Sequence, residues 1–146
     1  MRHEAAGVTE ILLDSAKNEF LEYGFHDASL RRVAAKSGVS TNSIYTRFHD
    51  KTGLFGAVVK EAADGLMEIY LNSISEAKET FDVKQAMQIG GEGTDIVLKY
   101  IYKYKDEFKL IFCCSVGTEY ENYFDKLAAI EENYYRQFAK QFSDGK

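Results

Sequence analysis

Six polar side chains between residues 41 and 47 are of the types that read the edges of DNA bases. They are Thr41, Asn42, Ser43, Tyr45, Thr46 and Arg47. Asparagine pairs bidentately with adenine and arginine with guanine, while threonine and serine hydrogen-bond either base or touch a thymine methyl group. In a helix-turn-helix, the second of two short helices places such side chains in the major groove.

The residues around this segment predict two short helices joined by a tight turn. Gly38 ends the first helix, and either Ser40 or Thr41 can cap the second. Ile44 and Phe48, four residues apart, give the second helix one buried side. The spacing therefore predicts a helix-turn-helix whose outer face carries the polar side chains.

Charge is distributed unevenly along the chain, whose formal net charge is −5. Between residues 29 and 51, five basic side chains accompany a single acidic one, so the local charge is +4. From residue 53 onward there are 11 basic and 16 acidic residues. A small basic segment before an acidic body suits phosphate contact by only one part of the molecule.

The rest of the chain predicts an all-α protein, because apolar residues recur at helical spacing and no run alternates as a strand does. The expected organisation is a three-helix DNA-binding head at residues 1–49 and a helical effector-binding and dimerisation body at residues 50–146. Besides the two short helices, helices are expected over about 8–23, 51–77, 82–104, 106–115 and 119–142. Glycines at 90, 91 and 93 are expected to weaken or bend the helix that contains them.

A longer pattern in the first third of the chain resembles the DNA-binding signature of the TetR family. The matching residues are Gly24-Phe25, Ser29-Leu30-Arg31-Arg32-Val33-Ala34, Gly38-Val39-Ser40, Ile44-Tyr45, Phe48, Lys51 and Leu54. The resemblance implies a transcriptional repressor that a small-molecule effector releases from its operator. The chain departs from the common pattern at Asn42, where many members have glycine, and at Arg47, where histidine or tyrosine is frequent. The base preference of relatives therefore does not carry over.

By position, the resemblance also implies roles for individual side chains on DNA. Those expected to face base edges are Arg31, Thr41, Asn42, Ser43 and Arg47. Those that match the usual phosphate-holding positions are Ser29, Tyr45 and Lys51. Physical chemistry agrees, because helix N-termini attract phosphate and a tyrosine offers a hydroxyl on a rigid ring.

Operator reading predicts a homodimer on a palindromic double-stranded site, since one short recognition helix covers only a few base pairs. Family members usually run longer and close their dimer with a helix pair near the C-terminus. This chain therefore either dimerises through other surfaces or is a shortened version of its relatives.

The second half of the chain is rich in aromatic residues, which can line an apolar cavity for a small effector. The expected effector is a small apolar or aromatic molecule, bound between the long helix after residue 51 and the later aromatic helices. The residues predicted to line its pocket are Tyr100, Tyr104, Phe108, Phe112 and Tyr123.

Other kinds of chemistry lack a motif in this sequence. The three histidines are scattered at His3, His26 and His49, and no nucleophile elbow or P-loop occurs, so neither enzyme activity nor a metal or cofactor is expected. No signal peptide or membrane-length apolar run is present, which favours a cytoplasmic protein.

Two alternatives stay open at the level of sequence. One is a DNA-binding regulator that is constitutive or controlled by a protein partner, with a solid body. The other is a helical interaction protein that does not bind DNA.

Overall fold

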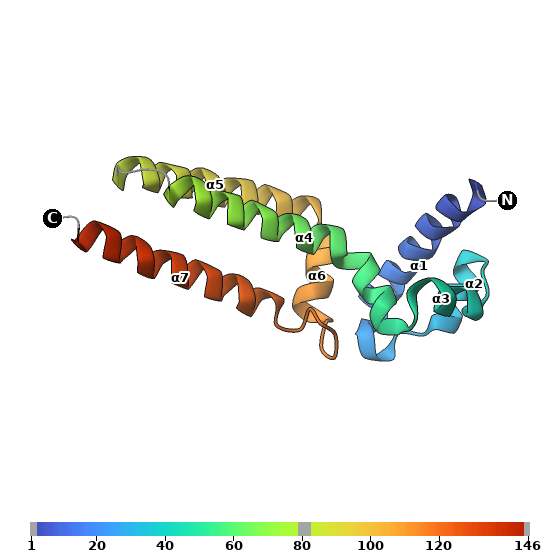
Figure 1. Ribbon diagram of the computed structural model, residues 1–146. Helices are drawn as coiled ribbons and strands as arrows, with labels where there is room; N and C mark the ends of the chain where they lie inside the picture. Colours follow the sequence, from blue (N-terminus) through green and yellow to red (C-terminus); the bar gives the residue numbers. More distant parts are fainter. Residues whose placement is uncertain (1–2, 79–82, 145–146) are drawn as a thin grey trace. The chain divides into compact units, whose positions relative to one another are not determined.

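The computed structural model describes residues 3–78 and 83–144, which form seven α-helices and no strand (Figure 1). The helices are α1 (His3–Asp27), α2 (Leu30–Ser37), α3 (Thr41–Phe48), α4 (Lys51–Lys78), α5 (Val83–Lys103), α6 (Lys105–Cys113) and α7 (Tyr123–Asp144). The predicted all-α fold is therefore confirmed. Residue 82, where α5 was expected to begin, lies outside the described residues. Within the described ranges, no helix is long and apolar enough to cross a membrane.

The helices divide into two compact units, and the division falls inside α4. The first unit combines the chain up to Ala62 with residues 105–121, and the second combines residues 63–104 with the chain from Asn122 onward. The first turns of α4 and all of α6 thus pack with the head, because Leu54, Phe55 and Val59 are buried there. A head of residues 1–49 is not a packing unit by itself. The division of functions at residue 50 stays a prediction.

An aromatic cluster forms the centre of the first unit. Along α1, every fourth residue faces this core and is fully buried, namely Leu12, Ala16 and Phe20. Gly24 then adopts φ 77° and ψ 171°, a conformation that L side chains rarely adopt, and so turns the backbone out of the helix. This turn brings the Phe25 ring within 6.1 Å of Phe20 and 5.6 Å of Phe55, measured between ring centroids.

Glu19 is a fully buried carboxylate that connects α1 to α2. Its Oε2 accepts hydrogen bonds from the Ser29 backbone N–H at 2.9 Å and from Arg32 Nε at 2.9 Å. Burial alone would raise the pKa of Glu19. The hydrogen bonds from Arg32 and Ser29, with the charges of Arg32 and Lys36, outweigh burial and lower the pKa of Glu19 from its ordinary value of 4.5.

We expect Glu19→Gln to lower the free energy of unfolding by about 1 to 3 kcal/mol at neutral pH, because it removes the charge that strengthens these buried hydrogen bonds. A carboxyl whose pKa is lowered by folding stabilises the protein above its unfolded pKa, and this contribution is lost as pH falls from about 4.5 through the folded pKa. The wild-type melting temperature should therefore fall more steeply below pH 4.5 than that of the variant.

Thermal unfolding followed by circular dichroism at neutral and acid pH measures both effects. Glu22→Gln is the matched control, since Glu22 is an exposed acid on the same helix. Equal losses in the two variants, or an unchanged acid slope in Glu19→Gln, would contradict the role given to Glu19.

The second unit contains the later turns of α4 together with α5 and α7. Two glycines allow α4 and α5 to approach closely. A Cβ atom at Gly65 would lie 2.0 Å from the Tyr100 hydroxyl oxygen, and one at Gly93 would lie 3.1 Å from Ser73 Oγ. The glycines at 90, 91 and 93 do not interrupt α5, which is continuous from Val83 to Lys103. Gly93 is buried at this close approach, and the expected weakening of the helix stays a prediction.

Candidate functional site

The helix-turn-helix is built by local caps on α2 and α3. The Ser29 hydroxyl caps α2 by accepting from the Arg32 N–H at 3.3 Å. Gly38 ends α2 in the left-handed conformation, with φ 73° and ψ 23°. Ser40 caps α3 by accepting from the Ser43 N–H at 3.1 Å. Of the two caps that the sequence allowed for α3, the structure uses Ser40.

The outer face of α3 presents the polar side chains that the sequence singled out. Ile44 is fully buried and anchors the helix, whereas the exposed positions are Asn42, Tyr45, Thr46 and Arg47. Thr41 and Ser43 are half-buried. The Asn42 side chain makes no hydrogen bond to a described residue, so its amide remains available to a base edge.

Arg47 is placed differently from the other base-reading candidates. Its guanidinium Nη1 donates to the Thr9 hydroxyl on α1 at 2.5 Å. This bond ties the outer end of α3 to α1. Contact with a base requires the Arg47 side chain to rearrange its contacts within the head.

A shallow depression of about 510 Å³ lies between α2, α3 and the start of α4. Its lining brings together five predicted DNA contacts, namely Ser29, Arg31, Thr41, Tyr45 and Lys51. Asp50 is also part of the wall, and its carboxylate accepts from the Gly53 N–H at 2.8 Å in the first turn of α4. Residues from three helices thus meet where a backbone phosphate could sit.

Lys51 has a structural role that the sequence reasoning missed. Its ammonium donates to the backbone carbonyls of His26 at 2.8 Å and Ala28 at 3.2 Å, and lies 5.1 Å from the Phe25 ring centroid. A lysine has three donors, so two of them hold the chain that leaves α1. Arg32, one of the five basic residues between residues 29 and 51, forms a 2.6 Å ion pair with Glu19.

The helical periodicity of α1 could have identified Glu19 as a buried carboxylate of the head. It lies three residues after Ala16 and four before Tyr23, on the same stripe as the apolar residues of α1. A charged residue on an apolar stripe requires a buried partner. The sequence pattern therefore indicated a buried carboxylate, and the structure identifies Arg32 as its partner.

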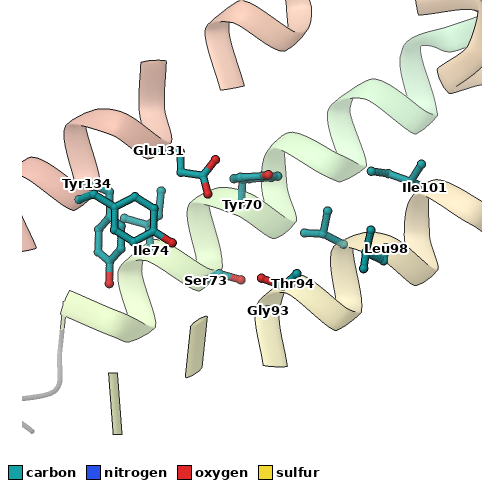
Figure 2. A pocket seen from close by; sticks show the side chains of 11 residues that line it. Tyr70, Ser73, Ile74, Gly93, Thr94, Leu98, Ile101, Glu131 and Tyr134 are labelled. Atoms are coloured by element: carbon teal, nitrogen blue, oxygen red, sulfur yellow. The ribbon is translucent and has the colours of Figure 1, made fainter. Parts of the chain in front are cut away.

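A second site is a pocket of about 310 Å³ within the other unit (Figure 2). Its walls come from α4, α5 and α7, and the lining residues are Tyr70, Ser73, Ile74, Gly93, Thr94, Val97, Leu98, Ile101, Glu131, Tyr134 and Tyr135. Figure 2 shows Glu131 and Tyr134 on α7 directed toward the side of α4 that carries Tyr70 and Ile74. Tyrosine rings and aliphatic side chains thus surround a space with one acidic group.

None of the five residues predicted to line an effector pocket lines this one. Phe108 is buried in the first unit, and Phe112 in the same unit is 73% exposed. The Tyr100 and Tyr104 rings pack on each other with centroids 4.8 Å apart. Tyr123 is buried and donates its hydroxyl to the Ala63 carbonyl at 2.5 Å. An aromatic-rich sequence does not reveal which rings share a cavity, because that depends on how the helices pack.

Comparison with known proteins gives an independent view of the head. Residues 12–58 match the family model described as bacterial regulatory proteins, tetR family. Curated relatives named HTH-type transcriptional regulator BetI, from Escherichia coli O139:H28 (strain E24377A / ETEC) and Klebsiella pneumoniae (strain 342), are each 35% identical over 63 residues. The match covers 43% of this chain and 32% of the relative, so it spans about a third of the relatives' length.

The fold as a whole is similar to that of a TetR-like transcriptional regulator from Rhodococcus sp. RHA1. The TM-score is 0.54 at 19% sequence identity, and the likeness covers 93% of this chain and 69% of the other. At this identity the likeness concerns the fold alone. The sequence matches, by contrast, concern the segment that contains α2 and α3.

Proposed function

We propose that this protein is a sequence-specific transcriptional regulator of the TetR family, because residues 12–58 match that family's model and the head resembles that of curated HTH-type regulators. In the proposed complex α3 enters the major groove of an operator, and the depression beside it holds a backbone phosphate. One observation carries the proposal, namely that the exposed polar face of α3 adjoins a depression lined by Ser29, Tyr45 and Lys51.

Base reading is assigned to Arg31, Thr41, Asn42, Ser43 and Arg47. Asn42 is the foremost of them, because it is exposed and its amide is not used within the described fold. The half-buried Ser43 has less freedom, since its N–H is bonded to the cap of α3. Arg47 is exposed on the same face of α3, and its role requires the guanidinium to exchange its bond to Thr9 for a bond to a base.

Phosphate contact is assigned to Ser29, Tyr45 and Lys51. Tyr45 is 50% exposed, so its hydroxyl can reach a phosphate without moving a packed side chain. The Lys51 ammonium, which the His26 and Ala28 carbonyls hold in place, supplies a positive charge to the same depression. The basic head and the acidic remainder of the chain favour an orientation in which only the head approaches DNA.

The proposed assembly is a homodimer on a palindromic operator. Two recognition helices related by a two-fold axis read two half-sites about one helical turn apart, and together they cover enough base pairs for specific binding. The proposed mechanism is repression relieved when a small molecule binds the pocket between α4, α5 and α7.

Selection of bound fragments from random double-stranded DNA tests this proposal. We expect the full chain, at near-physiological salt, to recover a palindrome with half-site centres about 10 base pairs apart. The same selection with Asn42→Ala is the matched control, and it should return an altered half-site. A pool that stays random for both proteins would overturn the proposal and favour a helical interaction protein without DNA binding.

A further inference from the structure

We propose that Cys113 and Cys114 form a dithiol site that binds a trivalent arsenical carrying one apolar substituent. The site lies in the first unit, so it is separate from the pocket between α4, α5 and α7. The inference goes beyond the proposed function and does not rest on it, since the ligand bonds to the thiols themselves and no DNA is needed to detect it.

The two cysteines lie where the chain leaves α6. Cys113 is the last residue of that helix, and the Cys114 N–H makes a final helical bond to the Leu110 carbonyl at 2.9 Å. Consecutive residues inside a helix point about 100° apart, because a turn holds about 3.6 residues. Since α6 ends at Cys113, no further turn fixes Cys114, and its side chain can turn toward a ligand shared with Cys113.

The backbone after the pair is held by hydrogen bonds. The buried Ser115 donates its hydroxyl to the Ile111 carbonyl at 2.5 Å, and Thr118 donates its hydroxyl to the Ser115 carbonyl at 2.7 Å. The thiols themselves are free, with Cys113 exposed and Cys114 half-buried. A ligand can therefore reach both sulfur atoms and orders little backbone when it binds.

The number of donors indicates the kind of ligand. A trivalent arsenic atom with one carbon substituent has two bonds left, which is the number of thiols at the site. Zinc sites in proteins usually take four ligands, and the described residues contain no group of three His, Cys, Asp or Glu side chains that could hold a metal ion. Two sulfur donors thus suit the arsenical and not a zinc ion.

A disulfide between the two cysteines is disfavoured by the length of the peptide unit. Neighbouring Cα atoms lie about 3.8 Å apart across a trans peptide, whereas disulfides usually join Cα atoms about 4.4 to 6.8 Å apart. An arsenic atom between the two sulfur atoms lengthens the bridge by one atom. The pair is therefore better suited to capture such an atom than to close on itself.

The reaction exchanges bonds without oxidation or reduction. In water an organic arsenoxide becomes a species with two As–OH groups. Each thiol passes its proton to one departing hydroxide, so two S–H and two As–O bonds break, two As–S bonds form and two water molecules leave. The arsenic stays trivalent throughout, and no further reactant is needed.

The titration of Cys114 agrees with this step. Burial and the neighbouring Cys113 raise the pKa of the Cys114 thiol, and the charge of Lys109 only partly offsets them. Cys114 therefore stays protonated at neutral pH and supplies one of the two protons that leave as water. The effect of Cys113 on this pKa also requires the two thiols to lie near each other.

Exposed apolar side chains flank the thiols in the sequence. Phe112, directly before Cys113, is 73% exposed, and Val116, two residues after Cys114, is 69% exposed. An apolar group on the arsenic can pack against this surface, and removal of apolar area from water stabilises the adduct. An aryl substituent on the arsenical fits these surroundings.

Intact-mass spectrometry of the full chain treated with phenylarsine oxide tests the site. Wild type should gain one phenylarsenic group and lose two hydrogens, and no other thiol can account for the gain because the chain has two cysteines. The adduct should persist in a large excess of glutathione, a monothiol, because both As–S bonds form within one site. Dimercaptopropanol, a dithiol, should remove it.

Cys113→Ser and Cys114→Ser are matched variants that each leave a single thiol. Each should release arsenic at a glutathione concentration at least about 100-fold below that needed for wild type, since a second, intramolecular bond strengthens binding by about 10² to 10⁴. Circular dichroism melting shows that the variants are folded. An absent wild-type adduct, a wild-type adduct released as easily as those of the variants, or a variant that retains arsenic as wild type does would overturn the inference.

Phe112→Ala tests the apolar surface while keeping both thiols. It should release the phenylarsenic adduct at a glutathione concentration about 3 to 10 times lower than wild type, because less apolar area is buried. Release of the smaller adduct formed by methylarsine oxide should be unchanged and serves as the control. Equal release of the phenylarsenic adduct from Phe112→Ala and wild type would overturn the preference for an apolar substituent.

Discussion

We expect replacement of Asn42 by alanine to change which bases the protein prefers and to weaken binding to the selected operator by about 1 to 3 kcal/mol. The physical reason is that an exposed amide, unused within the described fold, can make two hydrogen bonds to one base edge. Alanine cannot make them, so the loss is confined to operators that carry the preferred base. DNA with another base at that position should bind wild type and variant with similar affinity.

Tyr45→Phe is the matched control for phosphate contact. It removes one hydroxyl from a half-exposed ring, so packing is preserved and binding to every DNA sequence should fall by a similar factor. Titrations against a panel of operator variants at two salt concentrations distinguish a base-specific loss of affinity from a uniform loss. If Asn42→Ala also reduced all affinities equally, Asn42 would not be a base-reading residue.

Arg47 needs a control of its own, because its guanidinium donates to Thr9. Arg47→Ala should alter base preference if Arg47 reads DNA directly. Thr9→Val removes the acceptor and keeps the shape of the side chain. If Thr9→Val reproduced the effect of Arg47→Ala, Arg47 would act by positioning α3 against α1.

Lys51→Ala is expected to reduce the affinity for all DNA sequences by a similar factor. The slope of log affinity against log salt concentration should become shallower by about one unit. The interpretation requires a stability measurement, since the same ammonium holds the carbonyls of His26 and Ala28. Affinities should therefore be compared at a temperature where both proteins remain folded by circular dichroism.

The second large effect is expected from a ligand in the body pocket. Binding of a small apolar or aromatic effector should reduce operator affinity by roughly 5- to 150-fold, which corresponds to a coupling of about 1 to 3 kcal/mol. The proposed route is α4, which starts beside the DNA-facing depression at Lys51 and supplies Tyr70 and Ile74 to the pocket. The ligand must bind the DNA-incompatible arrangement more tightly than the DNA-bound one, because only such a difference shifts an equilibrium.

Thermodynamic linkage supplies the test of this coupling. Bound operator must reduce the affinity for the effector by the same factor by which the effector reduces the affinity for operator. Calorimetry with and without DNA can therefore be compared directly with DNA titrations with and without the effector.

Unequal factors in the two directions would show that the probe competes for DNA or binds elsewhere. An effector that binds the pocket but leaves operator affinity unchanged would contradict effector control. A constitutive or partner-controlled regulator would then be the better description.

The helix-turn-helix was predictable from sequence because its determinants are local. Ser29 and Ser40 cap helices within three residues of their own position, and Gly38 supplies the left-handed conformation that ends α2. The repeat of Leu12, Ala16 and Phe20 defines a buried face with no reference to the rest of the chain. Helix boundaries and the exposed polar face of α3 follow from these patterns.

Tertiary structure alone decided which residues meet across the helices. Three sets of contacts in the first unit join residues at least 10 positions apart in the sequence. Glu19 bonds to Ser29 and Arg32, Arg47 bonds to Thr9, and Lys51 bonds to the His26 carbonyl at the end of α1. The pocket is the clearest case, because an aromatic residue suits a solid core and a cavity equally well. Helix packing placed Tyr70, Tyr134 and Glu131 around the space and directed Phe108 and Phe112 elsewhere, since the direction of a side chain depends on the orientation of its whole helix.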